Sequence, residues 1–293
     1  MKKFKFVLIL FLTIIALAGA YFFQSNYRLA NVKGASVDLS GKLVINFLDV
    51  GQGDAILIRL PQGDDVLIDG GPDNTVLQKI GEYLPYGDRD IELMILTHPH
   101  SDHVTGLNEV LKRYGVKKIL MTGAIHTASD YLNFLEQIKE KKIPVEIIDS
   151  PRDLFLENDV DFKILYPDKS FSGQRVENLN NTSIVAQLIY ASTTVMLSGD
   201  FENEELLLNK GFNLKSDIYK VGHHGSNTAN SREFLEAISP LYAVILVGAD
   251  NKFGHPHFRT LRILEKIGAK IFRADQDGDV RFMSDGKAFE LIK

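Results

Sequence analysis

The sequence predicts an α/β fold in which two packed β-sheets are covered by helices on their outer faces. Short apolar runs of strand length form two strand-rich groups along the chain, and helical patterns follow the strands in each half. The chain has 293 residues, of which 45% are hydrophobic, so one large domain can bury a substantial core.

The first half starts as a meander of short strands and continues as an alternation of helices and strands. Gly-rich turns separate the first three strands, and a continuous apolar run follows the first helical pattern. The predicted strands cover residues 43–48, 55–60, 66–68, 91–97, 118–121 and 145–148, and the predicted helices cover residues 75–84, 104–114 and 131–141.

The second half starts with two β-rich segments, residues 154–166 and 182–197, which a polar stretch joins. Strands and helices then alternate again, and two strands close the chain. The predicted strands cover residues 216–221, 243–247, 270–272, 280–283 and 289–292, and the predicted helices cover residues 232–238 and 259–267.

The N-terminal residues have the charge order of a secretory signal or signal anchor. Lys2, Lys3 and Lys5 precede an apolar stretch over residues 6–23, which is about the length that spans a bilayer. We favour a retained anchor at residues 1–23 over a cleaved signal peptide, with a linker at 24–41 and a catalytic domain at 42–293. This predicts an extracytoplasmic protein, membrane-anchored or secreted, with no protein partner.

The composition of the chain excludes several kinds of metal ligand and catalytic group. The chain contains no cysteine, which excludes thiolate zinc ligands, disulfides and a cysteine nucleophile. The formal net charge of -5 gives no global attraction for nucleic acid, so such a substrate would need a local groove. Any metal must therefore bind to His, Asp or Asn side chains.

Four polar clusters follow predicted strands, where a scaffold places site residues on loops. They lie at residues 98–103, 198–200, 222–226 and 254–257, and seven of the eight histidines fall in three of them. His126 is the exception, and we interpret it chiefly as a loop residue. Imidazole and carboxylate are ordinary ligands of zinc and similar ions, so the clusters predict a metal-dependent hydrolase.

The order of these motifs resembles the metallo-β-lactamase superfamily. It is carried by LIDGG at residues 67–71, HPHSDH at 98–103, SGD at 198–200 and GH at 222–223. The strings FLDVGQGD (47–54), KVGHHGS (220–226), GHPH (254–257) and DQDG (275–278) are similar to the branch with the soluble domain of the competence DNA-uptake protein ComEC. The resemblance implies an αββα sandwich of two mixed sheets with a metal site along one sheet edge.

The resemblance also implies a set of metal ligands for one or two divalent ions, Zn or Mn. His98 and His100 would hold the first ion, Asp102 and His103 the second, and Asp200 would bridge them. Many relatives have another histidine as a further ligand of the first ion, but between these motifs the chain has only His126. Asn178, Asn180, Asn181 or Ser183 more closely match that region, which would favour Mn over Zn or leave the first position weak.

Further roles are expected around these ligands. We favour His223 over His224 as the last ligand because His223 directly follows the strand and glycine, which makes His224 a general acid or phosphate contact. His255, and less so His257, is expected at the rim as a cationic phosphate contact or proton donor. Candidates for supporting the ligands or contacting substrate are Asp54, Asp69, Asn181 and Ser226.

The predicted activity is that of a phosphodiesterase or nuclease acting on DNA, with Asp102, His224 and His255 as catalytic residues. A bound ion lowers the pKa of water from about 15.7 to about 7, which supplies a metal-bound hydroxide at neutral pH. Phe253 and Lys252 near the rim would help to hold a strand. The alternatives are a cell-envelope phosphoesterase of the teichoic acid phosphorylcholine esterase type and a non-catalytic metal-binding module in DNA uptake.

Overall fold

The fold is built from two sheets whose inner faces pack on each other. The computed structural model describes residues 39–157 and 159–292, and the residues from Leu39 onward form one compact unit. The predicted anchor at 1–23 and most of the predicted linker at 24–41 lie outside the described residues. Within the described part of the chain, no helix has the length and apolar character needed to cross a bilayer.

The first sheet has eight strands and combines an antiparallel half with a parallel half. Its order is β17-β16-β1-β2-β3-β5-β7-β8; neighbours from β17 to β3 are antiparallel, and those from β3 to β8 are parallel. The strands are β1 (Leu43–Phe47), β2 (Ile56–Arg59), β3 (Asp65–Ile68), β5 (Leu93–Ile95), β7 (Ile119–Met121), β8 (Val145–Ile147), β16 (Val280–Ser284) and β17 (Phe289–Ile292).

The second sheet has seven strands and is mixed in the same way. Its order is β15-β14-β13-β12-β11-β10-β9, antiparallel from β9 to β12 and parallel from β12 to β15. The strands are β9 (Arg152–Glu157), β10 (Val160–Tyr166), β11 (Val185–Tyr190), β12 (Thr193–Leu197), β13 (Ile218–Lys220), β14 (Tyr242–Ile245) and β15 (Lys270–Arg273). A separate parallel pair joins β4 (Asp90–Ile91) to β6 (Gly115–Val116).

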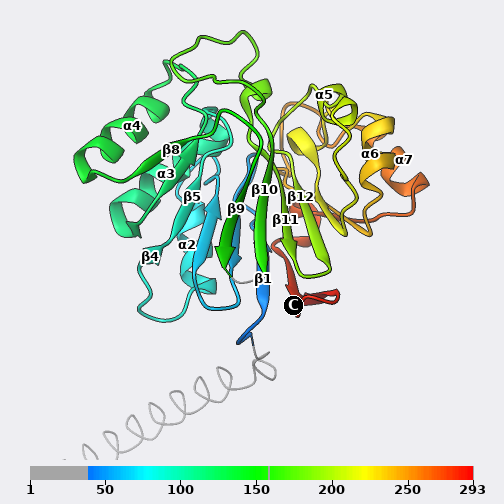
Figure 1. Cartoon of the computed structure of the whole chain (residues 1–293), viewed down its shortest axis with the longest axis horizontal. Coiled ribbons are helices and arrows are strands. Elements are labelled where there is room, and N and C mark those ends of the chain that lie inside the picture. Colours follow the sequence, from blue (N-terminus) through cyan, green and yellow to red (C-terminus); the bar gives the residue numbers. More distant parts are fainter. Residues whose placement is uncertain (1–38, 158, 293) are drawn as a thin grey trace, which may run out of the picture. The chain divides into compact units, whose positions relative to one another are not determined.

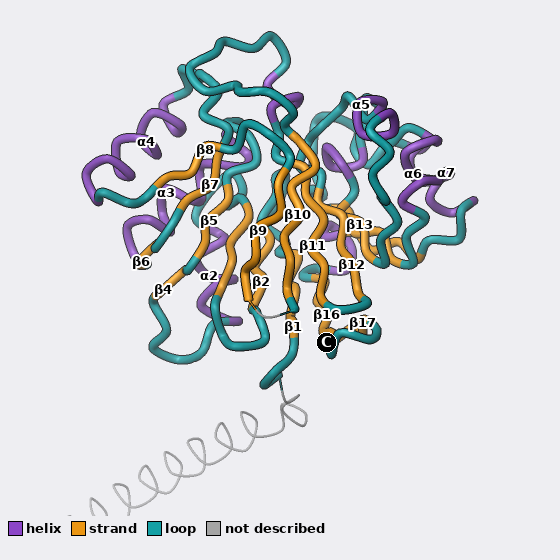
Figure 2. The backbone as a smooth tube through the Cα atoms, in the orientation of Figure 1, coloured by secondary structure: helices purple, strands orange, loops and turns teal. Residues whose placement is uncertain are grey.

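Helices cover the outer face of each sheet (Figures 1 and 2). The first sheet carries α2 (Thr75–Tyr83), α3 (Ser101–Arg113) and α4 (Ser129–Lys141), and the second carries α5 (Glu205–Asn209), α6 (Arg232–Ile238) and α7 (Phe258–Lys266). Each longer helix turns an apolar stripe inward, as Val76 and Ile80 do one turn apart on α2. Short helical turns occur at η1 (Leu179–Thr182), η2 (Gly222–Gly225) and α8 (Ala274–Asp277).

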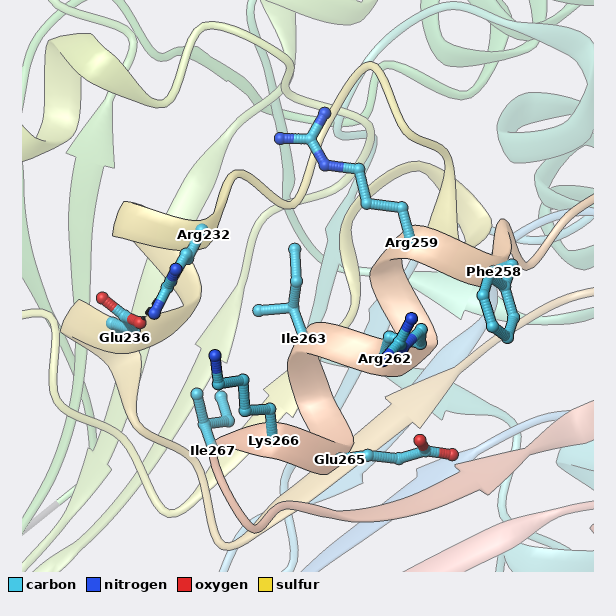
Figure 3. Close-up of a pocket in the computed structure, with 9 residues that line it drawn as sticks. All are labelled: Arg232, Glu236, Phe258, Arg259, Arg262, Ile263, Glu265, Lys266 and Ile267. Atoms are coloured by element: carbon cyan, nitrogen blue, oxygen red, sulfur yellow. Dashed lines mark hydrogen bonds and ion pairs between the residues drawn. The ribbon is translucent and has the colours of Figure 1, made fainter.

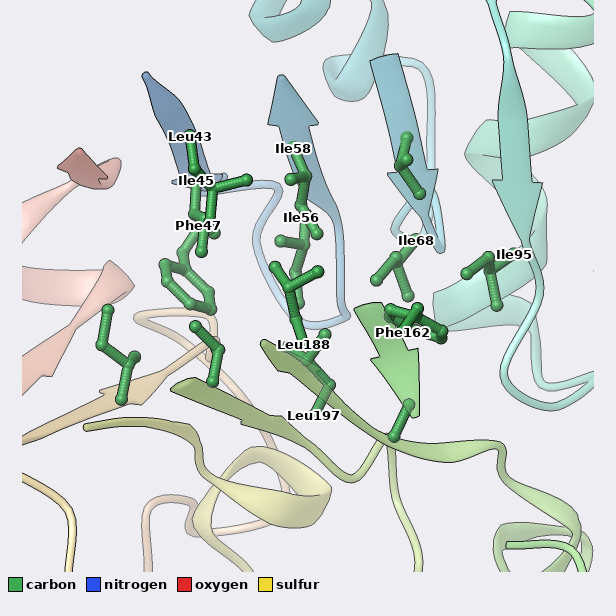
Figure 4. Close-up of a cluster of buried hydrophobic side chains, with 14 of the residues drawn as sticks. Leu43, Ile45, Phe47, Ile56, Ile58, Ile68, Ile95, Phe162, Leu188 and Leu197 are labelled. Carbon is green, nitrogen blue, oxygen red and sulfur yellow. The ribbon is translucent and has the colours of Figure 1, made fainter. Parts of the chain in front are cut away.

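Three hydrophobic clusters follow from this layering. The central cluster takes side chains from both sheets, and Figure 4 shows Ile45, Phe47 and Ile58 of the first sheet facing Leu188 and Leu197 of the second. The other two clusters lie between each sheet and its own helices. Burial of these apolar faces in four layers is the αββα sandwich that the sequence predicted.

The structure corrects several element bounds. The helix predicted over 104–114 begins at Ser101, so half of the histidine cluster lies on its first turn and not on a loop. The apolar run at 91–97 is divided between β4 and β5, and the two β-rich segments are divided into β9 with β10 and β11 with β12. The short elements β6, α5 and α8 were not predicted, because two to five residues show no period.

Candidate metal centre

The HPHSDH motif joins the end of β5 to the first turn of α3. His98 is buried just beyond the strand, His100 is the N-cap residue of α3, and Asp102 and His103 lie on its first turn. The helix approaches the loop after β3 closely because residue 106 is glycine: a Cβ there would lie 1.8 Å from the carbonyl oxygen of Gly70. This approach brings His103 to Asp69.

Asp200, on the loop after β12, lies at the middle of the cluster. Its Oδ2 atom is 3.3 Å from His103 Nε2, 3.4 Å from His224 Nε2 and 3.9 Å from His98 Nε2. The side chain is 2% exposed. One carboxylate oxygen is thus surrounded by imidazole nitrogens from both halves of the chain, as a bridging ligand would be.

The structure favours His224 over His223 as the remaining ligand, which differs from our preference. Potential ligand atoms of Asp102, His103, Asp200 and His224 all lie within 4.8 Å of one another. His224 Nε2 is also 3.3 Å from Asp102 Oδ2, whereas His223 Nε2 is 3.9 Å from Asp200 and its side chain is 22% exposed. Both histidines have left-handed backbones, with φ of 46° and 51°, and this turn of η2 directs the second ring inward.

Hydrogen bonds orient the imidazoles so that particular nitrogens face Asp200. His103 Nδ1 donates to Asp69 Oδ2 at 2.8 Å, and His224 Nδ1 donates to the Leu246 carbonyl at 2.9 Å. Thr97 Oγ1 lies 3.1 Å from His98 Nδ1 and donates to Asp69 Oδ2 at 2.7 Å. Because Nδ1 carries the hydrogen that is donated, the electron pair of Nε2 remains available to a metal. This is the usual arrangement of metal-bound histidines. Asp69 thus accepts hydrogen bonds from both His103 and Thr97.

The electrostatics of this cluster fit a cation. Burial alone would lower the pKa of His103 and His224, but the carboxylates around them, Asp200 above all, raise both pKa values well above the ordinary value. The pKa of Asp200 is held well below its usual range, because the charges of His224 and His103 outweigh its burial. His224 Nε2 and Asp200 Oδ1 are buried without a hydrogen-bond partner among the described residues. A divalent ion would supply the positive charge and use these donor atoms.

A buried ion pair supports the cluster from behind. Lys220, the last residue of β13, is 1% exposed and its Nζ contacts Asp54 Oδ2 in the GQGD turn. The same Nζ atom is 3.8 Å from Asp200 Oδ1 and donates to the Gly199 carbonyl. Asp54 Oδ1 lies 3.4 Å from His224 Nδ1. The pair therefore links the GQGD turn of the first sheet to the ligand loops of the second, and Asp54 also forms a possible ligand group with Asp69 and His103.

His98 and His100 form a second, less complete group of donors. His98 Nε2 and His100 Nδ1 lie 3.0 Å apart, and the ring of His126 lies 5.9 Å from that of His100. His126 Nδ1 is held at 3.0 Å by the Pro99 carbonyl. His126 is thus next to the first metal position. Burial and the charge of His103 lower the pKa of both His98 and His100, so each imidazole is neutral and able to bind a metal.

Three side chains of the asparagine-rich stretch contact Glu202. Asn178 and Asn180 donate to the carboxylate of Glu202, and Asn181 Oδ1 accepts from the Glu202 backbone N–H. Glu202 Oε1 in turn lies 2.9 Å from His223 Nδ1. Ser183 Oγ accepts from the Asp200 backbone N–H, which positions that carboxylate. Glu202 was not predicted, because only the contact across the fold distinguishes it from other surface glutamates.

The remaining candidates lie at the rim. The ring of His255 is 5.4 Å from His223, but burial and the charges of His223 and His224 lower its pKa to about 4. With this pKa the imidazole of His255 is neutral at pH 7, whereas the residue pattern predicted a cationic phosphate contact. His257 is exposed and caps α7, where its Nδ1 accepts from Arg259 N–H. Ser226 Oγ bonds within its own turn, to Thr228.

Comparisons with known proteins agree with this geometry. A family model described as the metallo-beta-lactamase superfamily matches residues 48–249. ComE operon protein 3 of Bacillus subtilis is 27% identical over 263 residues, which cover 83% of this chain and 33% of that protein. Competence protein ComA of Neisseria gonorrhoeae is 29% identical over 246 residues, which cover 80% of this chain and 31% of that protein. The chain spans about a third of the length of these relatives.

Solved structures show the same fold at low sequence identity. The metallo-beta-lactamase fold protein YhfI from Bacillus subtilis has a TM-score of 0.52 at 12% identity and covers 83% of this chain and 100% of its own. Igni18, a metallo hydrolase from Ignicoccus hospitalis, has a TM-score of 0.52 at 15% identity and covers 82% of this chain and 98% of its own. The chain belongs to the metallo-beta-lactamase superfamily, as a metal-dependent hydrolase of its ComEC-like branch.

Proposed function

We propose that the protein is a metal-dependent phosphodiesterase that hydrolyses DNA outside the cytoplasm. The observation that carries this proposal is the convergence of His98, His103 and His224 on one oxygen of Asp200. The relative named competence protein ComA supports DNA as the substrate. Lys2, Lys3 and Lys5 ahead of the apolar residues 6–23 support export with attachment to the membrane.

The ligands of the second ion would be Asp102, His103, Asp200 and His224, and those of the first would be His98, His100 and Asp200. Bound divalent ions would activate water and stabilise charge on the phosphoryl oxygens. The residues fit this role because the carboxylates of Asp102 and Asp200 keep depressed pKa values despite burial, through the nearby histidine charges. Both carboxylates are therefore ionised and available at neutral pH.

His223 is positioned to transfer a proton at the rim. Its Nδ1 atom is 2.9 Å from Glu202 Oε1, and its Nε2 atom is 3.9 Å from Asp200 Oδ2. A carboxylate that is hydrogen-bonded to one ring nitrogen orients the other nitrogen. In this assignment His223 donates a proton to the leaving oxygen while Glu202 holds the ring, which exchanges the roles first expected for His223 and His224.

Turnover by the purified full chain tests the proposal. With Mn or Zn added, the protein should hydrolyse bis(p-nitrophenyl) phosphate and nick plasmid DNA, but leave phosphorylcholine and nitrocefin intact. His100→Ala and Asp200→Ala should abolish turnover, and Lys141→Ala, at an exposed position on α4, should not change it. Hydrolysis of phosphorylcholine without nicking would indicate the cell-envelope phosphoesterase. A protein that binds both ions and cleaves none of the substrates would instead be a binding module.

A further inference from the structure

A groove with a volume of about 700 Å³ lies between α6 and α7, outside the metal centre. Figure 3 shows Arg259, Ile263 and Lys266 extending from α7 toward the side of α6, where Arg232 and Glu236 lie. Phe258 and Arg262 form a second row along α7. Positions four and seven residues apart share a helix face, which explains both rows.

The groove is more basic than the protein as a whole. Four cationic and two anionic side chains line it, although the chain has a formal net charge of -5. Arg232 forms an ion pair with Glu236, in which Arg232 Nε lies 2.7 Å from Glu236 Oε1. Arg259 and Lys266 make no ion pair with any residue that the structure describes, and both are exposed. Arg262 lies over the ring of Phe258 at 5.6 Å, so its charge also faces solvent.

The loop ahead of α7 joins this helix to the rim of the metal centre. The backbone N–H of His257, the N-cap residue of α7, donates to the carbonyl of Gly225 in η2 at 2.9 Å. Ahead of it, the ring of Phe253 stacks on His255 at 5.7 Å and is 70% exposed. His255 is in turn 5.4 Å from His223. An aromatic and basic surface therefore runs from His223 along α7.

We propose that Phe253, Phe258, Arg259, Arg262 and Lys266 form an α7 track that binds single-stranded nucleic acid beside the metal centre. The proposal rests on the phosphodiesterase function above and adds where the strand is held. Arg259 and Lys266 are two helical turns apart, about 10 Å, which suits phosphates along one strand. Phe253 and Phe258 are 70% and 69% exposed, and unpaired bases stack on such rings whereas paired bases do not present their faces.

Binding of a fluorescein-labelled oligo(dT) to the full chain in EDTA tests the track without turnover. Arg259→Glu with Lys266→Glu should raise the dissociation constant at least tenfold. The dependence of log affinity on log salt should become shallower by roughly 1.4, since each phosphate contact on a single strand contributes about 0.7. Lys139→Glu with Lys141→Glu is the matched control: it makes the same charge change at exposed positions on α4 and should leave binding within about twofold.

A second pair of variants tests the preference for a single strand. Phe253→Ala with Phe258→Ala should weaken oligo(dT) binding roughly tenfold and leave binding of a duplex of equal length nearly unchanged.

The charge-reversed variant should hydrolyse bis(p-nitrophenyl) phosphate at the wild-type rate with metal added, because this small substrate does not extend along α7. Arg259→Gln with Lys266→Gln should give the same direction of change with a smaller effect.

The outcomes separate the two proposals. Unchanged oligo(dT) affinity in the charge-reversed protein overturns the track, even where phosphodiester hydrolysis persists. Binding that depends on the track in a protein without phosphodiesterase activity supports the track and rejects only the proposed function. Binding of phosphatidylglycerol vesicles through Arg259 and Lys266, with no binding of oligo(dT), would show a membrane-contact surface and overturn the nucleic-acid proposal.

Discussion

The adjacent residues His223 and His224 have different surroundings although their side chains are identical. The left-handed backbone of both residues turns His224 toward Asp102 and Asp200 and leaves His223 beside Glu202. Neither ring could be assigned from the order of residues, because a glycine followed by two histidines carries no information on φ. The residue order favoured His223 as the ligand, whereas the observed backbone geometry favours His224.

Single substitutions should distinguish these two histidines. His224→Ala should lower the bound metal measured by inductively coupled plasma mass spectrometry, because it removes a nitrogen from the group around Asp200. His223→Ala should retain metal and lose roughly 10²-fold or more in turnover, as loss of a general acid does. Retention of metal by His224→Ala together with its loss from His223→Ala would reverse the assignment.

The Lys220–Asp54 pair should be needed for stability. Lys220→Met leaves the buried Asp54 carboxylate without its cation, and breaking a buried pair costs about 3–5 kcal/mol. Urea unfolding in EDTA measures this loss separately from metal binding. The double variant Asp54→Asn with Lys220→Met should recover part of the loss, since no charge is then stranded. Equal stability of Lys220→Met and wild type would show that the pair has no such role.

Asp65 should make stability depend on pH. Its side chain is 1% exposed, and burial, opposed by Arg59, raises its pKa to about 7. Between about pH 4 and pH 7 the folded protein retains a proton that the unfolded chain has released, so the wild type loses stability as pH rises through this window. Asp65→Asn removes that loss.

Urea unfolding at pH 5 and pH 8 measures the effect of Asp65. The stability of Asp65→Asn relative to wild type should increase between these values by about 2–3 kcal/mol. Asp250→Asn, an exposed position, serves as the control and should show no such increase. A difference that stays constant or falls with pH would contradict the raised pKa of Asp65.

At the scale of elements, the position of α3 decides whether the ligands meet. Gly106 contacts Gly70 so closely that Gly106→Ala must displace the helix, at a cost of about 1–3 kcal/mol or more, and should also weaken metal binding. Gly81 on α2 is exposed, and a Cβ at this position would have no other atom within 4 Å, so Gly81→Ala should be neutral or stabilise by about 0.5–1 kcal/mol. Thermal unfolding and metal content of both variants give the comparison; similar effects of the two would contradict a special role of Gly106.

The elements also show how far the sequence could be interpreted. Long periodic patterns, such as those of α4 and α7, were predicted within one or two residues of the observed start. The start of α3 was missed because the apolar stripe of this helix begins only at Val104. Ser101 and Asp102 belong to the ligand motif and are polar, so they do not extend that stripe. The role of Glu202 could not be predicted, since its partners Asn178, Asn180 and His223 come together only through pairing of β12 with β11 and β13.

For the whole molecule, metal binding should stabilise the fold. An ion that binds only the folded state at 100 times its dissociation constant contributes about 2.7 kcal/mol, which corresponds to a rise of roughly 5–10 °C in Tm for a domain of this size. Differential scanning fluorimetry with Mn or Zn added to EDTA-treated protein measures the shift. Asp200→Ala should show little or none, and an equal shift in that variant would place the stabilising ion elsewhere.

His103 and Asp200 are 97 residues apart along the chain and 3.3 Å apart in space. An ion shared between them would close a ring of the backbone that includes strands of both sheets. For a covalent link, closing a ring of about 100 residues removes unfolded-chain entropy worth about 4.7 kcal/mol. In a sequence with no cysteine, such an ion would serve as a cross-link that reductants cannot break and chelators can.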